Sequence, residues 1–305
     1  MKLDSTRRRL VGGFAAATLL ASFESWAKAP LQADAAIQAL TDVEARSGGR
    51  LGVCLLDTGS GRSIGHRVDQ RFGMCSTFKL LLAAAILREA DAGRLDLLTF
   101  VEYGKDDMVP HAPVTTKHLE QGGMSIVALA EAAQLTSDNV AANLLLRQLG
   151  GPAGFTRILR SMGDPETRVD RMEPEMNLVP SGEQRDTTTP RAMAHSVARI
   201  ITGDVLSAAA RDRLEQWMIA TETGRKRIRA GLPADWRAGD KTGTGLAPSM
   251  ANKHNDVAVA WPPGRAPLVI AAFFEAPGHF PHMRPQDDAV LAEVGRIAAG
   301  WVASA

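Results

Sequence analysis

Segments with the pattern of β-strands lie near the two ends of this chain, whereas its long middle has almost only helical patterns. Short apolar or alternating runs between glycine and proline turns predict strands at 50–56, 62–66, 237–244, 256–261 and 268–274. A sheet that uses both groups must be assembled from both ends of the chain, with the middle inserted as a helical unit. We therefore predict a mixed α/β (α+β) fold.

Helical spacing of apolar residues predicts one helix before the first strand and one after the last, at 31–45 and 284–302. Further helices are expected from Ser76 onward and at 126–135, 139–149, 153–162, 190–202 and 206–221. We expect residues 30–67 plus 218–305 to form the α/β domain and 68–217 an all-helical domain, with the active site in the cleft between them. With 305 residues and 45% hydrophobic content, the chain can bury the core that these units need.

The first 29 residues are expected to be an export signal and not part of the fold. Arginines at positions 7–9 precede an apolar stretch at 10–21, and small residues follow at 27–29. The paired arginines resemble a twin-arginine signal, and the apolar stretch is too short for a stable membrane anchor. We expect a periplasmic or secreted protein without such an anchor.

The charge and the cysteine content indicate whether to expect a nucleic-acid partner or a disulfide bond. The formal net charge is +1 and the basic run Lys226–Arg229 is short, so no nucleic-acid partner is expected. An exported chain with two cysteines could form one disulfide. Cys54 lies in a predicted strand and Cys75 at a predicted helix start, so we expect each to be a small buried apolar residue instead.

Ser76 and Lys79 stand three residues apart where Gly73 releases a loop into a long helix. Side chains at this spacing share one face of the first turn. A lysine beside a serine can accept the hydroxyl proton and activate the serine as a nucleophile, and a backbone amide at the helix start can face an oxyanion. The alternative is a helix start with a chance lysine, because the motif is short.

Ser137-Asp138-Asn139 precedes another apolar helical run. Ser or Asp in this place is typical of a helix N-cap, which is a complete structural explanation. Ser137 could also pass a proton to a leaving nitrogen, and the amide of Asn139 could hold a substrate carbonyl.

Lys241-Thr242-Gly243 lies on a predicted strand of small residues, where a ligand can lie along the sheet edge beside a positive charge. The alternative is an edge strand protected from aggregation by its lysine.

A loop without regular periodicity runs from Arg171 to Pro190. Arg171 and Asp186 are suited by charge to pin its two ends together. Glu173 and Asn177, four residues apart on one turn, could hold a water between them, and a carboxylate and an amide on one water make a hydrolytic base. Carboxylates near a loop are otherwise usually solvated.

Taken together and in this order, the four motifs resemble those of the class A serine β-lactamases across the whole mature chain. Pro113-Val114-Thr115 and the segment Asp186–Pro190 add to the resemblance. It implies an antiparallel five-stranded sheet flanked by N- and C-terminal helices, with an inserted all-helical domain. It also implies hydrolysis of the β-lactam amide of penicillins and, we expect, of cephalosporins.

The resemblance implies a role for each motif residue. Ser76 would attack the lactam carbonyl to give an acyl-enzyme, with Lys79 or Glu173 as the base, a choice that the sequence leaves open. Ser137 would deliver a proton to the departing nitrogen, and Glu173 with its water would hydrolyse the ester. The backbone amides of Ser76 and Thr244 would form the oxyanion hole, and Lys241 would hold the substrate carboxylate. The implied substrate-binding set is Asn139, Asn177, Thr242, Gly243, Thr244, Arg227 and His111.

Three positions depart from the family pattern. No arginine follows the Lys241 motif, and Arg227 is expected to substitute for it, the alternative being a surface arginine. His111 takes a gate position that is commonly aromatic. Family members that hydrolyse carbapenems often pair the cysteine before the nucleophile with a second one; here Gly245 stands in the partner position of Cys75, which argues against carbapenem hydrolysis.

Three other functions compete with this interpretation. A D,D-peptidase or penicillin-binding protein shares the first three motifs, but Glu173 and Asn177 argue against it. A β-lactam-sensing domain should be fused to a membrane-spanning region. A zinc hydrolase would have to use His279 and His282, which lie in a proline-rich loop. We expect a monomer that acts on a small-molecule β-lactam and needs no metal or other cofactor.

Overall fold

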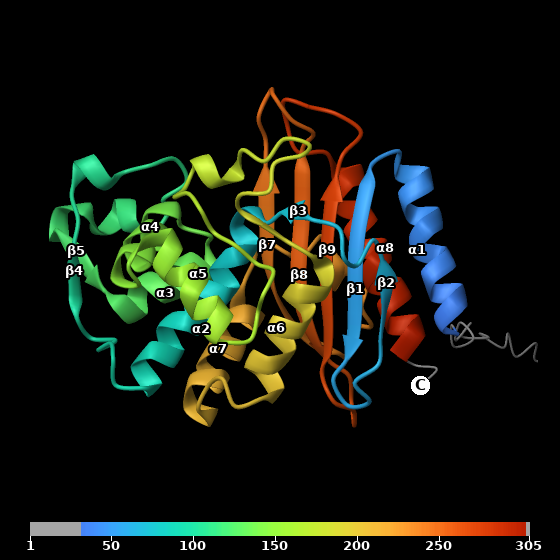
Figure 1. Ribbon diagram of the computed structural model, residues 1–305, viewed down its shortest axis with the longest axis horizontal. Coiled ribbons are helices and arrows are strands. Elements are labelled where there is room, and N and C mark those ends of the chain that lie inside the picture. Colours follow the sequence, from blue (N-terminus) through green and yellow to red (C-terminus); the bar gives the residue numbers. More distant parts are fainter. Residues whose placement is uncertain (1–31, 303–305) are drawn as a thin grey trace, which may run out of the picture.

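A central antiparallel sheet organises the molecule, whose computed structural model describes residues 32–302 (Figure 1). Its strands follow the spatial order β2-β1-β9-β8-β7. They span Arg50–Asp57 (β1), Ser63–His66 (β2), Arg237–Gly245 (β7), Lys253–Trp261 (β8) and Leu268–Glu275 (β9). The predicted antiparallel five-stranded sheet is confirmed. The predicted export signal lies outside the described residues.

The sheet joins segments from the two ends of the chain directly. β1 pairs with β2 on one side and with β9 on the other, where Leu51 lies opposite Phe274. β7 pairs with β8 alone and is therefore an edge strand. β8 begins at Lys253 and not at the predicted Asp256, because the polar residues at its start are buried and continue the pairing with both neighbours.

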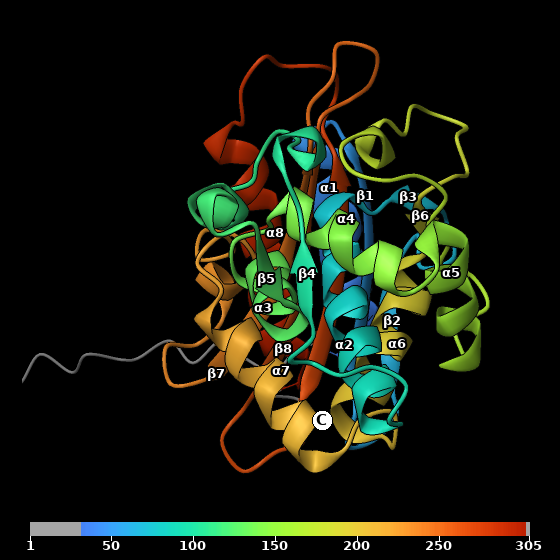
Figure 2. The same cartoon turned by 90° about the vertical axis from the view of Figure 1, so that its left-hand side faces the viewer.

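Both faces of the sheet are covered by helices, as Figures 1 and 2 show. α1 (Ala33–Ser47) and α8 (Pro285–Val302) pack against each other and against the sheet. α6 (Pro190–Thr202) packs against β1 and β9, and α7 (Ala208–Ala220) packs against β7. Alternate residues of β1 therefore enter two different cores, Leu51, Val53 and Leu55 with α1 and α8, and Cys54 and Leu56 with the helical part. Burial on both faces explains why this strand is almost wholly apolar.

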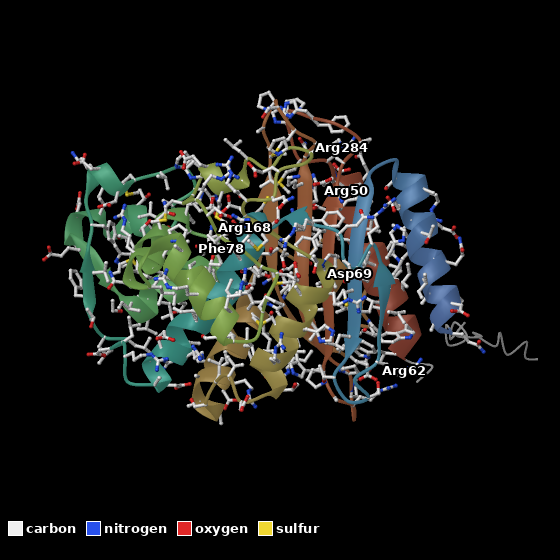
Figure 3. The ribbon with its side chains drawn as sticks, in the orientation of Figure 1. Arg50, Arg62, Asp69, Phe78, Arg168 and Arg284 are labelled. Atoms are coloured by element: carbon white, nitrogen blue, oxygen red, sulfur yellow. The ribbon has the colours of Figure 1, made fainter. Side chains whose placement is uncertain are left out.

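The helical part is built around α2 (Phe78–Asp91), whose apolar run from Leu80 to Leu87 is entirely buried. Phe78, labelled in Figure 3, meets Phe155 edge to face with 6.4 Å between ring centroids. The surrounding helices are α3 (Ile126–Leu135), α4 (Asn139–Gln148) and α5 (Gly151–Ser161). A helix that is apolar on all sides has to lie in the middle of a core, and α2 does.

The middle of the chain also contains four very short strands that the sequence analysis did not predict. β3 (Phe72–Gly73) pairs with β6 (Thr187–Thr188), and β4 (Phe100–Glu102) pairs with β5 (Gly123–Ser125). Two or three residues are too few to produce a detectable alternation, so these pairs leave no pattern in the sequence. Short 3₁₀ helices occupy Cys75–Thr77, Lys105–Asp107, Thr115–Gln121, Glu175–Asn177 and Ile228–Gly231.

α1 ends at a glycine in the left-handed conformation. Gly48 has φ +67°, and its amide donates to the carbonyl of Glu44 at 3.2 Å. Among residues 32–302, no helix combines the length and the apolarity that crossing a membrane requires.

Candidate active site

Ser76 and Lys79 meet at the start of α2, as their spacing predicts. Ser76 lies in the 3₁₀ turn Cys75–Thr77 and Lys79 in the first turn of the helix that follows. The Lys79 ammonium donates to the Ser76 hydroxyl at 3.0 Å. Lys79 is fully buried whereas Ser76 is partly exposed. A substrate can therefore reach the Ser76 hydroxyl but not the Lys79 ammonium.

Backbone strain is concentrated around this pair. Cys75, Ser137 and His111 all have positive φ, at +47°, +63° and +63°. Non-glycine residues rarely adopt this conformation, which costs about 1–3 kcal/mol each and is commonest at functional sites. The local backbone is thus held in its shape by the surrounding fold and not by its own preferences.

Glu173 lies against the same two side chains. Its carboxylate oxygen Oε1 is 3.0 Å from the Lys79 Nζ and 3.4 Å from the Ser76 Oγ. The other oxygen, Oε2, accepts from the Asn177 side chain at 2.5 Å. Glu173 and Asn177 are therefore in direct contact, and the water that they are predicted to share stays a prediction. The solvated-carboxylate alternative is wrong because Glu173 is 2% exposed. Both candidate bases are within reach of the serine hydroxyl.

The loop that carries Glu173 is tied down at both ends. Arg171 donates to Asp186 at 2.6 Å, and the same carboxylate accepts two backbone amides near Arg171. This confirms the predicted Arg171–Asp186 pin. Asn143 of α4, which the sequence analysis missed, holds the middle: its side chain donates to the Glu173 carbonyl and accepts from the Glu173 amide, both at 2.8 Å. An asparagine inside an apolar helical run was the one signal available.

Ser137 and Asn139 face Lys79 from the start of α4. The ammonium donates to the Ser137 carbonyl at 2.8 Å, lies 3.4 Å from the Ser137 hydroxyl, and donates to the Asn139 side-chain oxygen at 2.5 Å. The cap interpretation is also confirmed, with Asp138 as the N-cap accepting from the Ala141 amide. The motif therefore combines a helix cap at Asp138 with contacts to Lys79 from Ser137 and Asn139.

Lys241, Thr242 and Thr244 line up along the edge strand β7. Lys241 is fully buried and donates to the carbonyl of Thr242 at 3.0 Å, so it is not a solvated guard of the edge. Gly243 lies so close to the start of α2 that a Cβ there would be 2.6 Å from the Met74 carbonyl oxygen. Only glycine permits this approach, which brings the backbone of β7 beside the turn that carries Ser76.

Arg227 contacts the C-terminal part of β7. The guanidinium donates to the Thr244 hydroxyl at 2.8 Å and to the backbone carbonyls of Gly243 and Asn255. Its Nε donates to Asp288 of α8 at 2.8 Å, a partner that the sequence analysis did not predict. Arg227 is 3% exposed, so the surface-arginine alternative is wrong.

Burial shifts the proton affinities of the site. It lowers the pKa of Lys79, against the attraction of the Glu173 carboxylate. Burial together with the nearby Lys79 cation lowers the pKa of Lys241 to about 7. The pKa values of both thiols, Cys54 and Cys75, are raised to about 12 by burial. Both cysteines are free and buried, which confirms that they are apolar packing residues.

Ser76 opens into a pocket of about 460 Å³, which the buried Lys79, Glu173 and Lys241 do not line. Its lining residues are Ser76, His111, Ser137, Asn139, Asn177, Thr223, Arg227, Thr242, Thr244 and Met283. All of the implied substrate-binding residues except the buried glycine at 243 therefore line one cavity. Thr223 and Met283 were not predicted.

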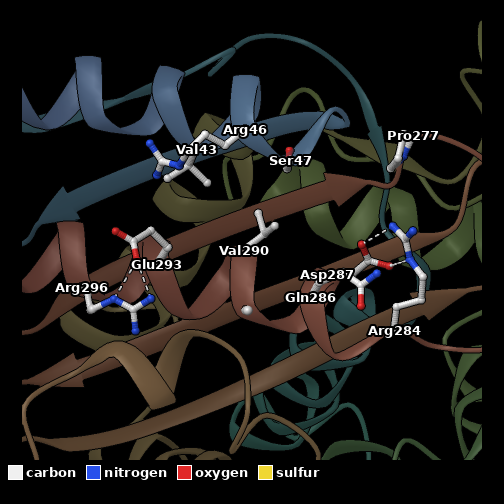
Figure 4. A pocket seen from close by; sticks show the side chains of 11 residues that line it. Val43, Arg46, Ser47, Pro277, Arg284, Gln286, Asp287, Val290, Glu293 and Arg296 are labelled. Carbon is white, nitrogen blue, oxygen red and sulfur yellow. Dashed lines mark hydrogen bonds and ion pairs between the residues drawn. The ribbon is translucent and has the colours of Figure 1, made fainter.

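A second hollow, of about 440 Å³, lies between α1 and α8 (Figure 4). Four of its charged residues form two ion pairs, Arg284 with Asp287 and Arg296 with Glu293, and Arg46 also lines it. It therefore offers no reactive group comparable to those around Ser76. Within residues 32–302 no group of three His, Cys, Asp or Glu side chains could hold a metal ion, which leaves His279 and His282 without a zinc site there.

Comparison with known proteins gives one consistent answer. The family model described as the β-lactamase enzyme family matches residues 33–302. The chain is 45% identical to β-lactamase AST-1 of Nocardia asteroides, over 95% of this chain and 94% of that protein. It is 43% identical to the carbapenem-hydrolyzing β-lactamase KPC of Klebsiella oxytoca, over 92% and 94%.

Solved structures agree with the sequence relatives. An ancestral (GNCA) class A β-lactamase matches with a TM-score of 0.81 and 53% identity, covering 86% of this chain and 98% of the other. A β-lactamase from Xanthomonas campestris matches with a TM-score of 0.83 and 44% identity, covering 89% and 99%.

Proposed function

The chain belongs to the class A serine β-lactamases, and we propose that it opens the β-lactam ring through an acyl-enzyme on Ser76. The protein is a hydrolase of the β-lactam amide bond. The observation that carries the proposed residue roles is that the Ser76 hydroxyl lies within 3.4 Å of both Lys79 and Glu173, two buried groups that can exchange its proton.

In the acylation step, Ser76 attacks the lactam carbonyl carbon and its proton passes to Lys79 or, through a water, to Glu173. The lowered pKa of Lys79 supports a basic role, since a neutral amine is the form that accepts a proton. The backbone amides of Ser76 and Thr244 stabilise the oxyanion, and Ser137 passes a proton to the departing nitrogen. The contact of Lys79 with both serines supports this route.

In the deacylation step, Glu173 removes a proton from a water that Asn177 helps to hold, and the resulting hydroxide attacks the ester carbon. The bond from this carbon to the Ser76 oxygen then breaks, and the oxygen takes back a proton to restore the hydroxyl. The substrate carboxylate is held by Lys241, Thr242 and Thr244, with Arg227 behind them. The bond from Arg227 to the Thr244 hydroxyl supports its role as the substitute arginine.

Asn139 and His111, which line the same pocket, are proposed to contact the rest of the substrate, and Gly243 lets it lie along β7. Penicillins and cephalosporins are the proposed substrates. Cys75 has Gly245 and not a second cysteine beside it, with 2.9 Å between the Cys75 sulfur and a Cβ built at that glycine. We therefore do not propose carbapenems as preferred substrates.

The remaining proposals concern organisation and location. We propose the two-domain division at 30–67 plus 218–305 and 68–217, with the site at their junction. A monomer is proposed because one chain supplies every residue of the pocket. Export to the periplasm or the medium is proposed from the arginines and the apolar stretch before residue 29.

The deciding experiment follows penicillin absorbance far beyond one equivalent per enzyme, with the wild type and Glu173→Ala. Continued loss with the wild type, together with a stable acyl-enzyme on Ser76 in the variant, is the expected result. Wild-type loss that stops at one equivalent would indicate a penicillin-binding or sensing protein. Normal turnover by Glu173→Ala would refute the role given to Glu173.

A further inference from the structure

Met283 is the single aliphatic residue among those that line the pocket of Ser76. The other lining residues carry hydroxyl, amide, imidazole or guanidinium groups. Met283 is 46% exposed, one of few large apolar side chains left open on the described surface. Met283 therefore supplies exposed apolar surface inside the pocket that is proposed to bind the substrate.

The loop that carries Met283 is held rigidly from one side by Asn252, a fully buried residue. The Asn252 side chain donates to the Phe280 carbonyl at 2.9 Å and accepts from the Phe280 amide at 3.2 Å. Its backbone bonds to Gly278 and Ala276 in the same loop. Four hydrogen bonds from one residue thus fix the chain just before Met283.

The chain just after Met283 is fixed by Arg284. Its guanidinium stacks on the Phe280 ring at 3.4 Å from the centroid. It also forms two hydrogen bonds with Asp287 of α8 (Figure 4). Met283 therefore stands between two anchored points, and its exposure is a property of a built loop and not of a loose end.

Asp288, which follows Asp287 in α8, connects this helix to the pocket. Asp288 accepts from Arg227, and Arg227 donates to Thr244. Met283 lines the same pocket as Arg227 and Thr244, and its loop leads into the helix turn that holds Arg227.

We propose that Met283 is a specificity-determining residue that lies beside the substrate carboxylate and contacts an apolar substituent on the ring carbon adjacent to the carbon that bears this carboxylate. The inference rests on the proposed function, because the position of the carboxylate comes from it. The unbranched thioether can adjust to substituents of different shape, and covering an apolar group there removes apolar surface from water on both partners.

The test uses two cephalosporins with the same 7-acylamino group, one with hydrogen and one with a phenylvinyl group at C3. For Met283→Ala, kcat/KM for the phenylvinyl compound should fall about 5- to 20-fold, mainly through KM, whereas the hydrogen compound should change less than about 2-fold. Met283→Leu should restore most of the loss.

Leu246→Ala is the matched control, since Leu246 is 41% exposed but does not line the pocket. It should leave the ratio of the two kcat/KM values unchanged. Equal losses for both cephalosporins in Met283→Ala, or an unchanged ratio, would overturn the inference while penicillin turnover by the wild type leaves the proposed function standing. A wild type that turns over no β-lactam would remove both.

Discussion

Replacing Asn143 by alanine should damage the step that frees the enzyme from its acyl intermediate. The Asn143 side chain is 6% exposed, and it satisfies both the amide and the carbonyl of Glu173 at 2.8 Å. Its removal leaves two buried backbone groups without partners, at about 1–3 kcal/mol each. We expect a loss of about 4 kcal/mol in the free energy of unfolding and a melting temperature lower by about 10 °C.

The same change lets the Glu173 carboxylate move relative to its water, whereas Ser76 and Lys79 keep their contact. A displacement of about 1 Å can cost a catalytic step about 100-fold. Asn143→Ala should therefore show a rapid burst of one equivalent of penicillin followed by turnover about 100-fold below the wild type. Stopped-flow absorbance measures the burst, and mass spectrometry of the quenched enzyme detects the acyl group.

Ser196→Ala is the control for stability alone. Its hydroxyl donates to Asp164 at 2.8 Å, is buried, and makes no contact with Glu173. This variant should melt earlier than the wild type, yet show no burst. If Asn143→Ala melted at a lower temperature and still turned over at the wild-type rate, the argument that these two hydrogen bonds position Glu173 would be wrong.

Three other measurements test the roles of two cationic side chains and the burial of the two thiols. Because the pKa of Lys241 is lowered to about 7, its ammonium loses a proton as the pH rises through that value. The kcat/KM for carboxylate-bearing β-lactams should therefore fall on the alkaline side of pH 7. Lys241→Arg should move this fall to higher pH. Arg227→Ala removes a charge-assisted hydrogen bond worth about 1.5–3 kcal/mol and should lower kcat/KM about 10- to 100-fold, mostly through KM; an unchanged KM would contradict the role. With thiol pKa values of about 12, Cys54 and Cys75 should both resist a thiol reagent at pH 8 in the folded protein and both react in denaturant.

Patterns confined to neighbouring residues predicted most of the fold. The helices at Ile126–Leu135 and Pro190–Thr202 lie within the predicted bounds because a cap and a regular apolar spacing mark both. The Ser76–Lys79 contact could also be predicted from the sequence, because side chains three residues apart lie on the same face of a helix.

Contacts between distant segments could not be derived in the same way. Nothing near Asp288 in the sequence indicates that it meets Arg227, and nothing near Asn252 indicates that it holds the loop before Met283. Such pairs depend on how the sheet and α8 are stacked, which is decided by the sum of many apolar contacts and not by any local pattern. The motif residues far apart in the chain were brought together in advance only through the family resemblance.

The pairing of β1 with β9 has a consequence for the newly made chain. Leu51 faces Phe274, and translation at about 5–20 residues per second separates their synthesis by roughly 10–45 s. During that interval β1 can pair only with β2, and its other edge has no partner until β9 is made. A nascent chain that stops before β9 lacks the centre of the sheet. The sheet that carries Lys241 and Thr244 can therefore be completed only after most of the polypeptide has been made.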